Sequence, residues 1–234
     1  GTNGKTTTTT LVGEIMKAHL GREKVFVVGN IGNPYTAESR KTTKESVTVG
    51  EISSFQLETT HSFRPAVSAI LNITPDHLNR HHTMEAYVAA KEHIAAMQTK
   101  DDICVLNYEN AYARRFGDRC PARVVWFSSA RELEEGYYLK GDKVFRALSG
   151  QRQELLDIHR DMRLVGLCNV ENVMAAIAIA EGMGVPMDDS GHRPGVSGRG
   201  APHRVRGHQG RGGLLQRFQG DQSRCRHPGH PGHA

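Results

Sequence analysis

The sequence predicts an α/β domain with a mostly parallel sheet flanked by helices. A glycine-bearing segment, GTNGKTT from Gly1 to Thr7, stands directly before a helical pattern. Short β-branched apolar runs then alternate with helical patterns through residues 1–189. Such runs, apolar on both faces, are typical of strands buried in a parallel sheet. The chain has 234 residues, which is enough for one sizeable domain without disulfides or structural metals.

The first helix is expected over Thr6–Leu20, because Leu11, Ile15 and Met16 form one apolar stripe and Gly21 follows as a stop. The first strand is expected over Lys24–Val28, the sequence KVFVV. Further strands are expected at 46–52, 66–73, 103–106 and 123–127, a hairpin over 137–148 turning at Gly141-Asp142, and Ala-rich helices over 84–97 and 169–182.

Polar residues end three of the expected strands, at Asn30, Glu51 and Asn72. In open parallel sheets, ligands bind at the carboxyl ends of the strands. We therefore expect these three side chains to lie near a functional site.

The GTNGKTT segment contains GxxGK[ST], the C-terminal part of the phosphate-loop pattern. In that pattern, backbone N–H groups and a helix N-terminus hold the nucleotide phosphates. Lys5 is expected to reach the β- and γ-phosphates and Thr6 to ligate Mg²⁺, with Gly1, Thr2, Asn3, Gly4 and Thr7 completing the loop. A chance Gly-Lys-Thr turn is the alternative, and the position between a helix and buried strands favours the nucleotide. The pattern's upstream Gly is absent, so we expect a truncated start.

Composition excludes several classes of protein. The cysteines, at 104, 120, 168 and 225, form no CxxC pair, which argues against a zinc site or a disulfide scaffold and favours a reducing cytoplasm. No apolar run approaches the 18 or so residues needed to span a bilayer. We therefore expect neither a structural metal nor a membrane partner.

The segment Ser190–Ala234 differs in kind from the rest. It contains eight Arg, no Lys and one acid, a net charge of +7, which leaves 22 basic and 24 acidic residues in the first 189 positions. Gly, Arg, His and Pro supply 29 of its 45 residues. Such a composition buries too little apolar surface to offset chain entropy, so we expect a disordered tail.

Four ordered motifs carry a family resemblance: GTNGKTT, GNIG from Gly29, EISSFQLE from Glu51 and ILNITPDHLNRH from Ile70. Together they resemble the Mur ligases over residues 1–189, which implies a P-loop-type central ATP-binding domain. SSFQLE is similar to the members that add D-glutamate to UDP-N-acetylmuramoyl-L-alanine. The resemblance implies ATP and two Mg²⁺ ions, these two small-molecule substrates and a monomeric enzyme of peptidoglycan synthesis.

The resemblance also implies residue roles. Glu51 would ligate the first Mg²⁺ together with Thr6, and His77 the second, while also contacting substrate. Asn72 would bind the muramoyl-alanine substrate. Lys91 resembles a lysine carried as a carbamate, which would give hard Mg²⁺ an oxygen ligand. Without the motif, His77 and Lys91 would be taken as a structural histidine and a solvated surface lysine.

Residues Asn169 and Asn172 lie in GLCNVENVMAA, which resembles the family's GxHNxxN segment. The resemblance implies that Asn172 hydrogen-bonds adenine and that Asn169 belongs to the same side of the nucleotide site. Cys168 replaces the usual His, which is a departure from the pattern.

A reading-frame error would explain the unusual composition of the tail. Residues Leu214–Pro228, back-translated with chosen synonyms and read one nucleotide later, yield YYNDSKGTNPDAAI, which resembles a C-terminal motif of the family. We hypothesise a single frameshift between about Pro186 and Gly200. A nucleic-acid-binding arm is the competing interpretation of the Arg-rich composition, but only Phe218 could stack on bases there.

Two other functions compete with the D-glutamate ligase. A sister ligase, adding another amino acid or extending folate with glutamate, would use the same loop, although the folate relatives differ at Lys5-Thr6-Thr7. The second competing function is ATP binding without catalysis, by an inactive fragment. The family's flanking domains, which hold UDP and the incoming amino acid, are not found in this sequence.

Overall fold

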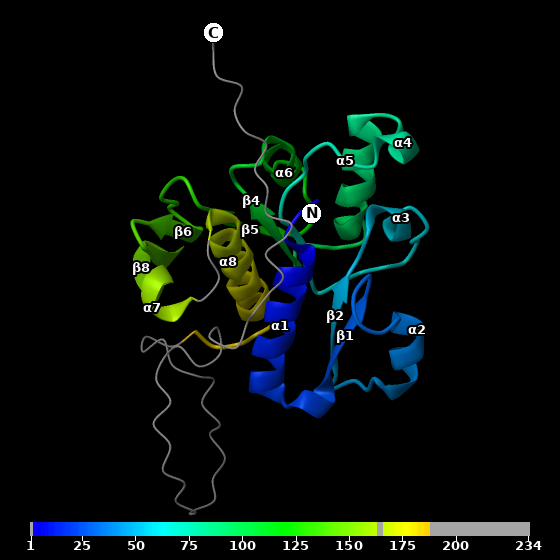
Figure 1. Ribbon diagram of the computed structural model, residues 1–234, viewed down its shortest axis with the longest axis horizontal. Helices are drawn as coiled ribbons and strands as arrows, with labels where there is room; N and C mark the ends of the chain where they lie inside the picture. Colours follow the sequence, from blue (N-terminus) through cyan, green and yellow to red (C-terminus); the bar gives the residue numbers. More distant parts are fainter. Residues whose placement is uncertain (1, 163–165, 188–234) are drawn as a thin grey trace, which may run out of the picture.

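The computed structural model describes residues 2–162 and 166–187. It shows parallel strands with helices on their faces, as expected (Figure 1). The expectations for Gly1 and for the tail at 190–234 fall outside the described residues. The strands form two sheets, one of two strands and one of six, where the sequence predicted one mostly parallel sheet.

The smaller sheet pairs β1 (Val25–Gly29) with β2 (Val47–Glu51) in parallel, with Gly29 opposite Glu51. The larger sheet has the order β3-β4-β5-β6-β7-β8, and it is parallel from β3 to β6 and antiparallel from β6 to β8. Its strands are β3 (Val67–Ile70), β4 (Ile103–Asn107), β5 (Arg123–Ser128), β6 (Gly136–Lys140), β7 (Lys143–Leu148) and β8 (Gln151–Asp157). The expected hairpin at Gly141-Asp142 is confirmed.

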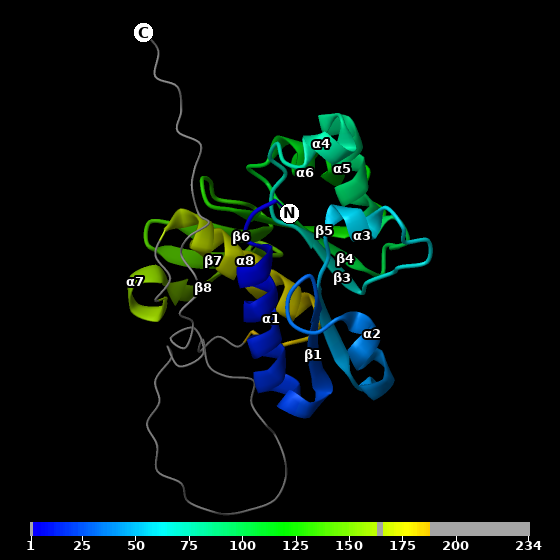
Figure 2. The same ribbon diagram turned by 45° about the vertical axis from the view of Figure 1, so that its right-hand side comes forward.

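Two 16-residue helices, α1 (Lys5–Leu20) and α8 (Leu167–Gly182), lie side by side in both views (Figures 1 and 2). The shorter helices are α2 (Tyr35–Glu38), α3 (Ser54–Leu57), α4 (Leu78–His81), α5 (Met84–Glu92), α6 (Ala111–Gly117) and α7 (Ile158–Asp161), with 3₁₀ turns at Arg22–Lys24, Ser39–Lys41 and His93–Ala95.

The main core fills the space between these two long helices and the sheets. Leu11 and Met16 of α1 and Met174 of α8 are each no more than 2 % exposed, and they belong to one cluster with Val105 and Phe127 of the larger sheet. Burying such a side chain contributes about 1.5–3 kcal/mol. The stripe predicted from the sequence therefore holds the start of α1, and with it the loop, against the rest of the domain.

A cavity of about 740 Å³ lies between one edge strand of the smaller sheet, β2, and one edge strand of the larger sheet, β3. Strand β2 pairs only with β1, and β3 only with β4, so each has one edge without a strand partner among the described residues. The cavity is lined by both of these strands, by α1 and by the end of α8.

Two elements end earlier than the sequence suggests. The strand expected over 66–73 ends at Ile70, because the loop takes over its pairing: the carbonyl of Asn72 accepts a hydrogen bond from the Thr2 N–H. The helix expected over 84–97 ends at Glu92 and continues as a 3₁₀ turn, after which Met97 is 49 % exposed.

Candidate functional site

The glycine loop passes directly into α1. Gly4 adopts φ 80°, a left-handed conformation open mainly to glycine, and a Cβ there would overlap the Asn172 side chain of α8. Lys5 is the first helical residue, and its Nζ donates to the Thr2 carbonyl over 3.1 Å. The free N–H groups of this helix start are suited to bind an anion, as the motif predicts.

Glu51 ends β2 directly beside the loop. One carboxylate oxygen accepts from the Thr6 hydroxyl over 2.8 Å, and the other accepts from the Asn30 amide over 3.0 Å. Glu51 is only 3 % exposed, so its charge lies in a partly desolvated position where it interacts strongly with a cation. The structure thus brings Glu51 together with Thr6 and Asn30 at one edge, and the Mg²⁺ ligation expected of Glu51 and Thr6 stays a prediction.

The short helix α3 follows Glu51 because of a capping box. The Ser53 hydroxyl accepts from the Gln56 N–H over 3.3 Å, and the Gln56 side chain accepts from the Ser53 N–H over 2.9 Å. This reciprocal pair satisfies two donors at the helix start. It therefore sets the start of α3 at Ser54, three residues after Glu51.

Asn72 also lies at this edge, where it contacts the loop itself. Its Oδ1 accepts from the Asn3 N–H over 2.8 Å, and its Nδ2 donates to the Asn3 carbonyl over 3.1 Å. The Thr2 hydroxyl adds a bond to the Thr74 carbonyl over 3.2 Å. Asn72 therefore shapes the loop, and its expected contact to substrate stays a prediction.

Lys91 is buried, at 7 % exposure, and its Nζ lies 4.5 Å from the centroid of the Tyr87 ring. Burial, together with the nearby charge of Lys5, lowers the pKa of Lys91 to about 8, while Asp76 acts in the opposite direction. The interpretation as a solvated surface lysine is therefore wrong. Carbamate formation requires the neutral amine, and an amine with such a lowered pKa has a larger neutral fraction near neutral pH than an ordinary lysine.

His77 occupies the turn before α4 with φ 53°, a conformation that is uncommon for a residue other than glycine. Its side chain is 49 % exposed, and its Nε2 lies 3.4 Å from Asp76 Oδ2. Its ring lies against Phe55, with centroids 5.1 Å apart. The exposed imidazole is thus held at the surface between Phe55 and the Tyr87 ring, whose centroid lies 6.4 Å away, and it is accessible to a ligand.

Asn169 and Asn172 both lie in the first turns of α8 and are buried. Asn172 Oδ1 accepts from the Thr8 hydroxyl, and its Nδ2 donates to Asn169 Oδ1, each over 3.4 Å. The structure brings Asn172 to the loop, next to Gly4, with Asn169 hydrogen-bonded to it. Their expected contact to adenine stays a prediction.

The arrangement fits Mg²⁺ bound with a nucleotide. Within the described ranges, no group of three or more His, Cys, Asp or Glu is placed to hold a metal by itself. Mg²⁺ commonly takes one or two carboxylates and completes its shell with water and phosphate oxygens. Glu51 and Thr6 supply two oxygen ligands next to a helix N-terminus that suits phosphate, which is the set such an ion needs.

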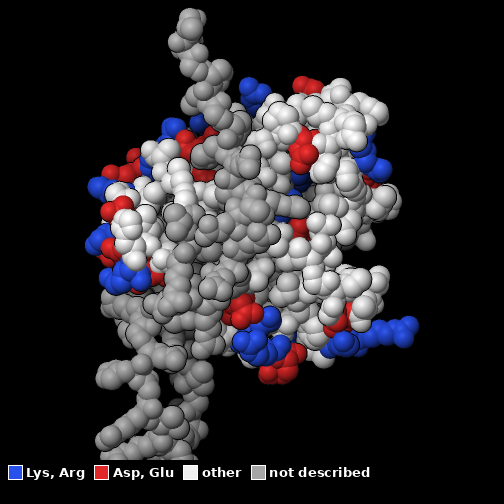
Figure 3. Space-filling view, viewed as in Figure 1, with Lys and Arg blue, Asp and Glu red and all other residues white. Residues whose placement is uncertain are grey.

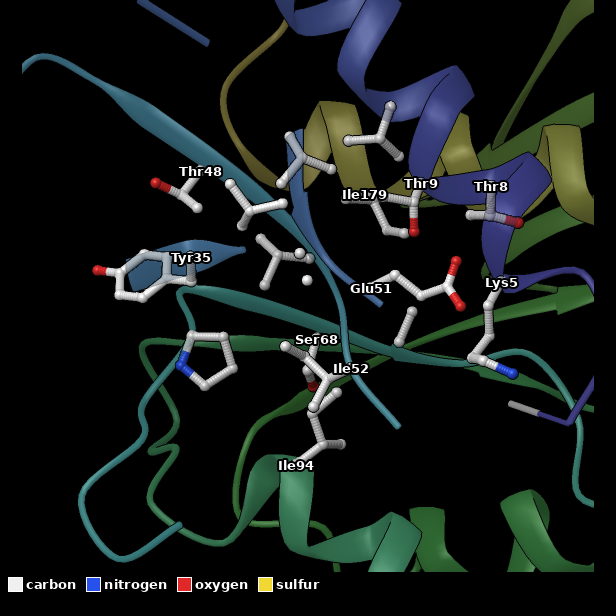
Figure 4. A pocket seen from close by; sticks show the side chains of 18 of the residues that line it. Lys5, Thr8, Thr9, Tyr35, Thr48, Glu51, Ile52, Ser68, Ile94 and Ile179 are labelled. Carbon is white, nitrogen blue, oxygen red and sulfur yellow. The ribbon is translucent and has the colours of Figure 1, made fainter. Parts of the chain in front are cut away.

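Lys5 and Glu51 lie at one end of the cavity between β2 and β3, toward the start of α1 (Figure 4). Further from the loop the lining becomes mainly apolar, with Ile52, Ile94 and Ile179 among its residues. On the face shown in Figure 3, acidic and basic side chains of the described residues are interleaved around the edges and do not form one basic patch. None of the helices in the described ranges is long and apolar enough to span a membrane.

Tyr87 is the site residue that sequence reasoning missed. It is 1 % exposed, its hydroxyl lies 3.2 Å from the Thr2 hydroxyl, and its ring packs near His77 as well as Lys91. Burial raises the pKa of Tyr87. Its position one helical turn before Lys91 was the available signal, because residues four apart share a helix face.

Comparison with known proteins gives a consistent result. Residues 1–180 match the model of the Mur ligase middle domain. The UDP-N-acetylmuramoylalanine–D-glutamate ligase of Lachnoclostridium phytofermentans is 56 % identical over 188 residues, which is 80 % of this chain and 41 % of the relative. The enzyme of the same name from Clostridioides difficile is 49 % identical over 180 residues, 77 % of this chain and 39 % of the relative. The chain thus spans about two fifths of the length of these relatives.

Solved structures agree at the level of fold. The MurF ligase from Thermotoga maritima in complex with ADP is 19 % identical with a TM-score of 0.54, over 80 % of this chain and 45 % of that one. The UDP-N-acetylmuramoylalanyl-D-glutamyl-2,6-diaminopimelate–D-alanyl-D-alanyl ligase from Acinetobacter baumannii is 17 % identical with a TM-score of 0.57, over 81 % of this chain and 43 % of that one.

Proposed function

Because this chain belongs to the Mur ligase family, whose middle domain it contains, we propose that it forms the ATP-binding core of a ligase joining D-glutamate to UDP-N-acetylmuramoyl-L-alanine. The observation that carries the proposal is the contact of Thr6 with Glu51 at the start of α1. The relatives at 56 % and 49 % identity, both named as D-glutamate ligases, support the choice of amino acid.

The proposed reaction has two steps. The alanyl carboxylate attacks the γ-phosphorus of ATP, which forms an acyl phosphate and releases ADP. The D-glutamate amine then attacks the acyl carbon, loses a proton, and phosphate leaves with the C–O bond electrons. Mg²⁺ would supply charge neutralisation on the phosphates when bound by Glu51 and Thr6. Lys5 and the helix start would hold the β- and γ-phosphates.

The remaining residues have supporting roles in this proposal. His77 and Lys91, the latter as a carbamate, would serve a second Mg²⁺, and His77 and Asn72 would contact the muramoyl-alanine substrate. Asn169 and Asn172 would hold the adenine side of ATP, with the loop residues from Gly1 to Thr7 around its phosphates. Lys91 gains support from its burial and lowered pKa.

We further propose that residues 1–189 are the central domain of a longer, monomeric cytoplasmic enzyme, and that 190–234 is frameshifted. The cavity between β2 and β3 supports the first part. A strand directly N-terminal to the loop would fit between these two edges, since Thr2 already donates to Asn72 just beyond β3. Phosphate loops follow a strand in this way.

The test is phosphate release from ATP in the presence of UDP-N-acetylmuramoyl-L-alanine, with and without D-glutamate. It is run on this chain and on a frame-corrected version extended to the length of the relatives. Release from the extended version only, and only with D-glutamate, is expected. Dependence on another amino acid or on folate would instead identify a sister ligase. ATP binding without phosphate release in either version would identify an inactive nucleotide-binding protein.

A further inference from the structure

The turn that carries His77 has the backbone hydrogen bonds of one helical turn only. Helix α4 is a single turn bounded by two residues of positive φ, His77 at 53° and His82 at 65°. One isolated turn is marginal because helix nucleation is unfavourable. Contacts from elsewhere in the domain must therefore fix its position.

His81 makes those contacts. Within residues 77–82, all of which the structure describes, it alone is buried, with its side chain 3 % exposed. Its Nε2 lies 3.0 Å from Ser54 Oγ, and its Nδ1 lies 3.2 Å from Glu58 Oε1. Both partners belong to the segment that follows Glu51, so the imidazole joins the two segments that carry Glu51 and His77.

The chemistry of the three groups fixes their roles. The Glu58 carboxylate can only accept, so His81 Nδ1 donates to it. In the neutral imidazole, Nε2 then accepts from the Ser54 hydroxyl. The other Glu58 oxygen accepts from Arg80 over 2.9 Å, which adds a second bond between the same two segments.

Ring packing restrains the same histidine. The His81 ring stacks on Phe55, with centroids 5.5 Å apart and planes at 17°, and it lies 5.0 Å from the Tyr87 ring. Phe55 also contacts the His77 ring. A rotation of His81 would therefore disturb the ring against which His77 rests.

We propose that His81, held by Ser54 and Glu58, is a positioning residue that fixes His77 relative to Glu51. The proposal rests on the proposed function, in which His77 and Glu51 serve the same magnesium-bound ATP. Partners that orient metal ligands in this way typically change metal affinity by 10–100-fold when removed. Ser, His and Glu also form hydrolytic triads, but Ser54 is 4 % exposed and therefore poorly accessible to a substrate.

The test compares His81→Phe, which keeps an aromatic ring and removes both hydrogen bonds, with His93→Phe. His93 Nε2 donates one bond to the Thr60 carbonyl and lies outside the joined segments, so His93 is a matched control. The first readout is NMR of the metal-free chain, in which the nuclear Overhauser contacts between His77 and Phe55 are followed. They are expected to be lost in His81→Phe and kept in His93→Phe.

The second readout is Mn²⁺ binding in the presence of ATP, followed by electron paramagnetic resonance. The Mn²⁺ dissociation constant is expected to rise about tenfold in His81→Phe and to stay unchanged in the control. Unchanged ring contacts and Mn²⁺ affinity in His81→Phe would overturn the proposal. If the unmodified chain fails to bind Mn²⁺ with ATP, the proposed function fails, and the ring contacts still decide the positioning role.

Three milder variants test the proposal if His81→Phe fails to fold. Ser54→Ala should weaken the ring contacts and the Mn²⁺ affinity in the same direction. Glu58→Gln keeps an acceptor for Nδ1 and should resemble the unmodified chain, whereas Glu58→Ala should not. Equal behaviour of Glu58→Gln and Glu58→Ala would contradict the role of Nδ1, and labelling of Ser54 by a fluorophosphonate would point to a nucleophile instead.

Discussion

The Thr6 hydroxyl donates to the Glu51 carboxylate over 2.8 Å, which joins the first turn of α1 to the last residue of β2. Glu51→Gln should therefore weaken Mn²⁺ binding in the ATP complex by at least tenfold, because the carboxylate charge that attracts the ion is lost. Glu38→Gln is the control, since Glu38 is also buried and bonded, to Asn33, but lies in α2. An equal loss in both variants would show a general effect of removing a buried charge.

Gly4→Ala should destabilise the protein and abolish ATP binding. A left-handed φ costs a residue with a Cβ about 1–2 kcal/mol, and that Cβ would also overlap the Asn172 amide. Gly141→Ala is the control that introduces the backbone strain without a steric overlap, because Gly141 has φ 57° and open space around it. Chemical denaturation should show a larger loss for Gly4→Ala.

Asn172→Ala combined with Gly4→Ala tests the overlap directly. The double variant should recover part of the free energy of unfolding, since the amide that meets the new Cβ is gone. Strict additivity of the two single changes would mean that Gly4 and Asn172 do not interact.

Lys91 should make stability depend on pH. Its pKa is about 8 in the folded chain and about 10.4 when unfolded, so between these values the unfolded state binds more protons. Stability due to this group should therefore rise as pH increases from about 8 to about 10.4, by on the order of 3 kcal/mol. Lys91→Met should remove this rise, as measured by denaturation at several pH values. An unchanged pH slope would contradict the burial of the ammonium group.

Tyr87 links the loop to Lys91 through two different parts of its side chain. Tyr87→Phe removes the hydroxyl beside Thr2 and should cost about 1 kcal/mol of stability. Tyr87→Leu also removes the ring face beneath the Lys91 ammonium, so it should lower stability further and change the pKa of Lys91. NMR titration of the Lys91 Cε signal measures this pKa, and identical values in both variants would argue against the ring contact.

Much of the site could be predicted because it depends on local pattern. The stripe of Leu11 and Met16 identified α1, and the rule for parallel strands brought Asn30 and Glu51 to one edge. Other features depend on tertiary contacts that no local pattern encodes. Asn72 lies beyond the end of β3 because it is hydrogen-bonded to Thr2 and Asn3. Lys91 is buried because it packs against Tyr87.

Two missed elements show the same limit. Strand β8 (Gln151–Asp157) is mostly polar and lies at the sheet edge, where it pairs with β7 and packs through two apolar residues, the buried Leu156 and the partly buried Leu155. Helix α6 (Ala111–Gly117) has seven residues, too few for a clear period, and it is set by Asn110, whose side chain caps it through the Ala113 N–H.

The most direct test of the account is equilibrium binding of ATP with Mg²⁺ to the 234-residue chain. Saturable binding is predicted, weakened at least tenfold by Lys5→Ala and by chelation of Mg²⁺, since a hydrogen bond to a charged group contributes about 1.5–3 kcal/mol. Lys17→Ala, which removes a lysine at the far end of α1 that is paired with Glu14, should leave binding unchanged. Binding that is the same in Lys5→Ala and Lys17→Ala, and independent of Mg²⁺, would contradict the nucleotide site proposed at the loop.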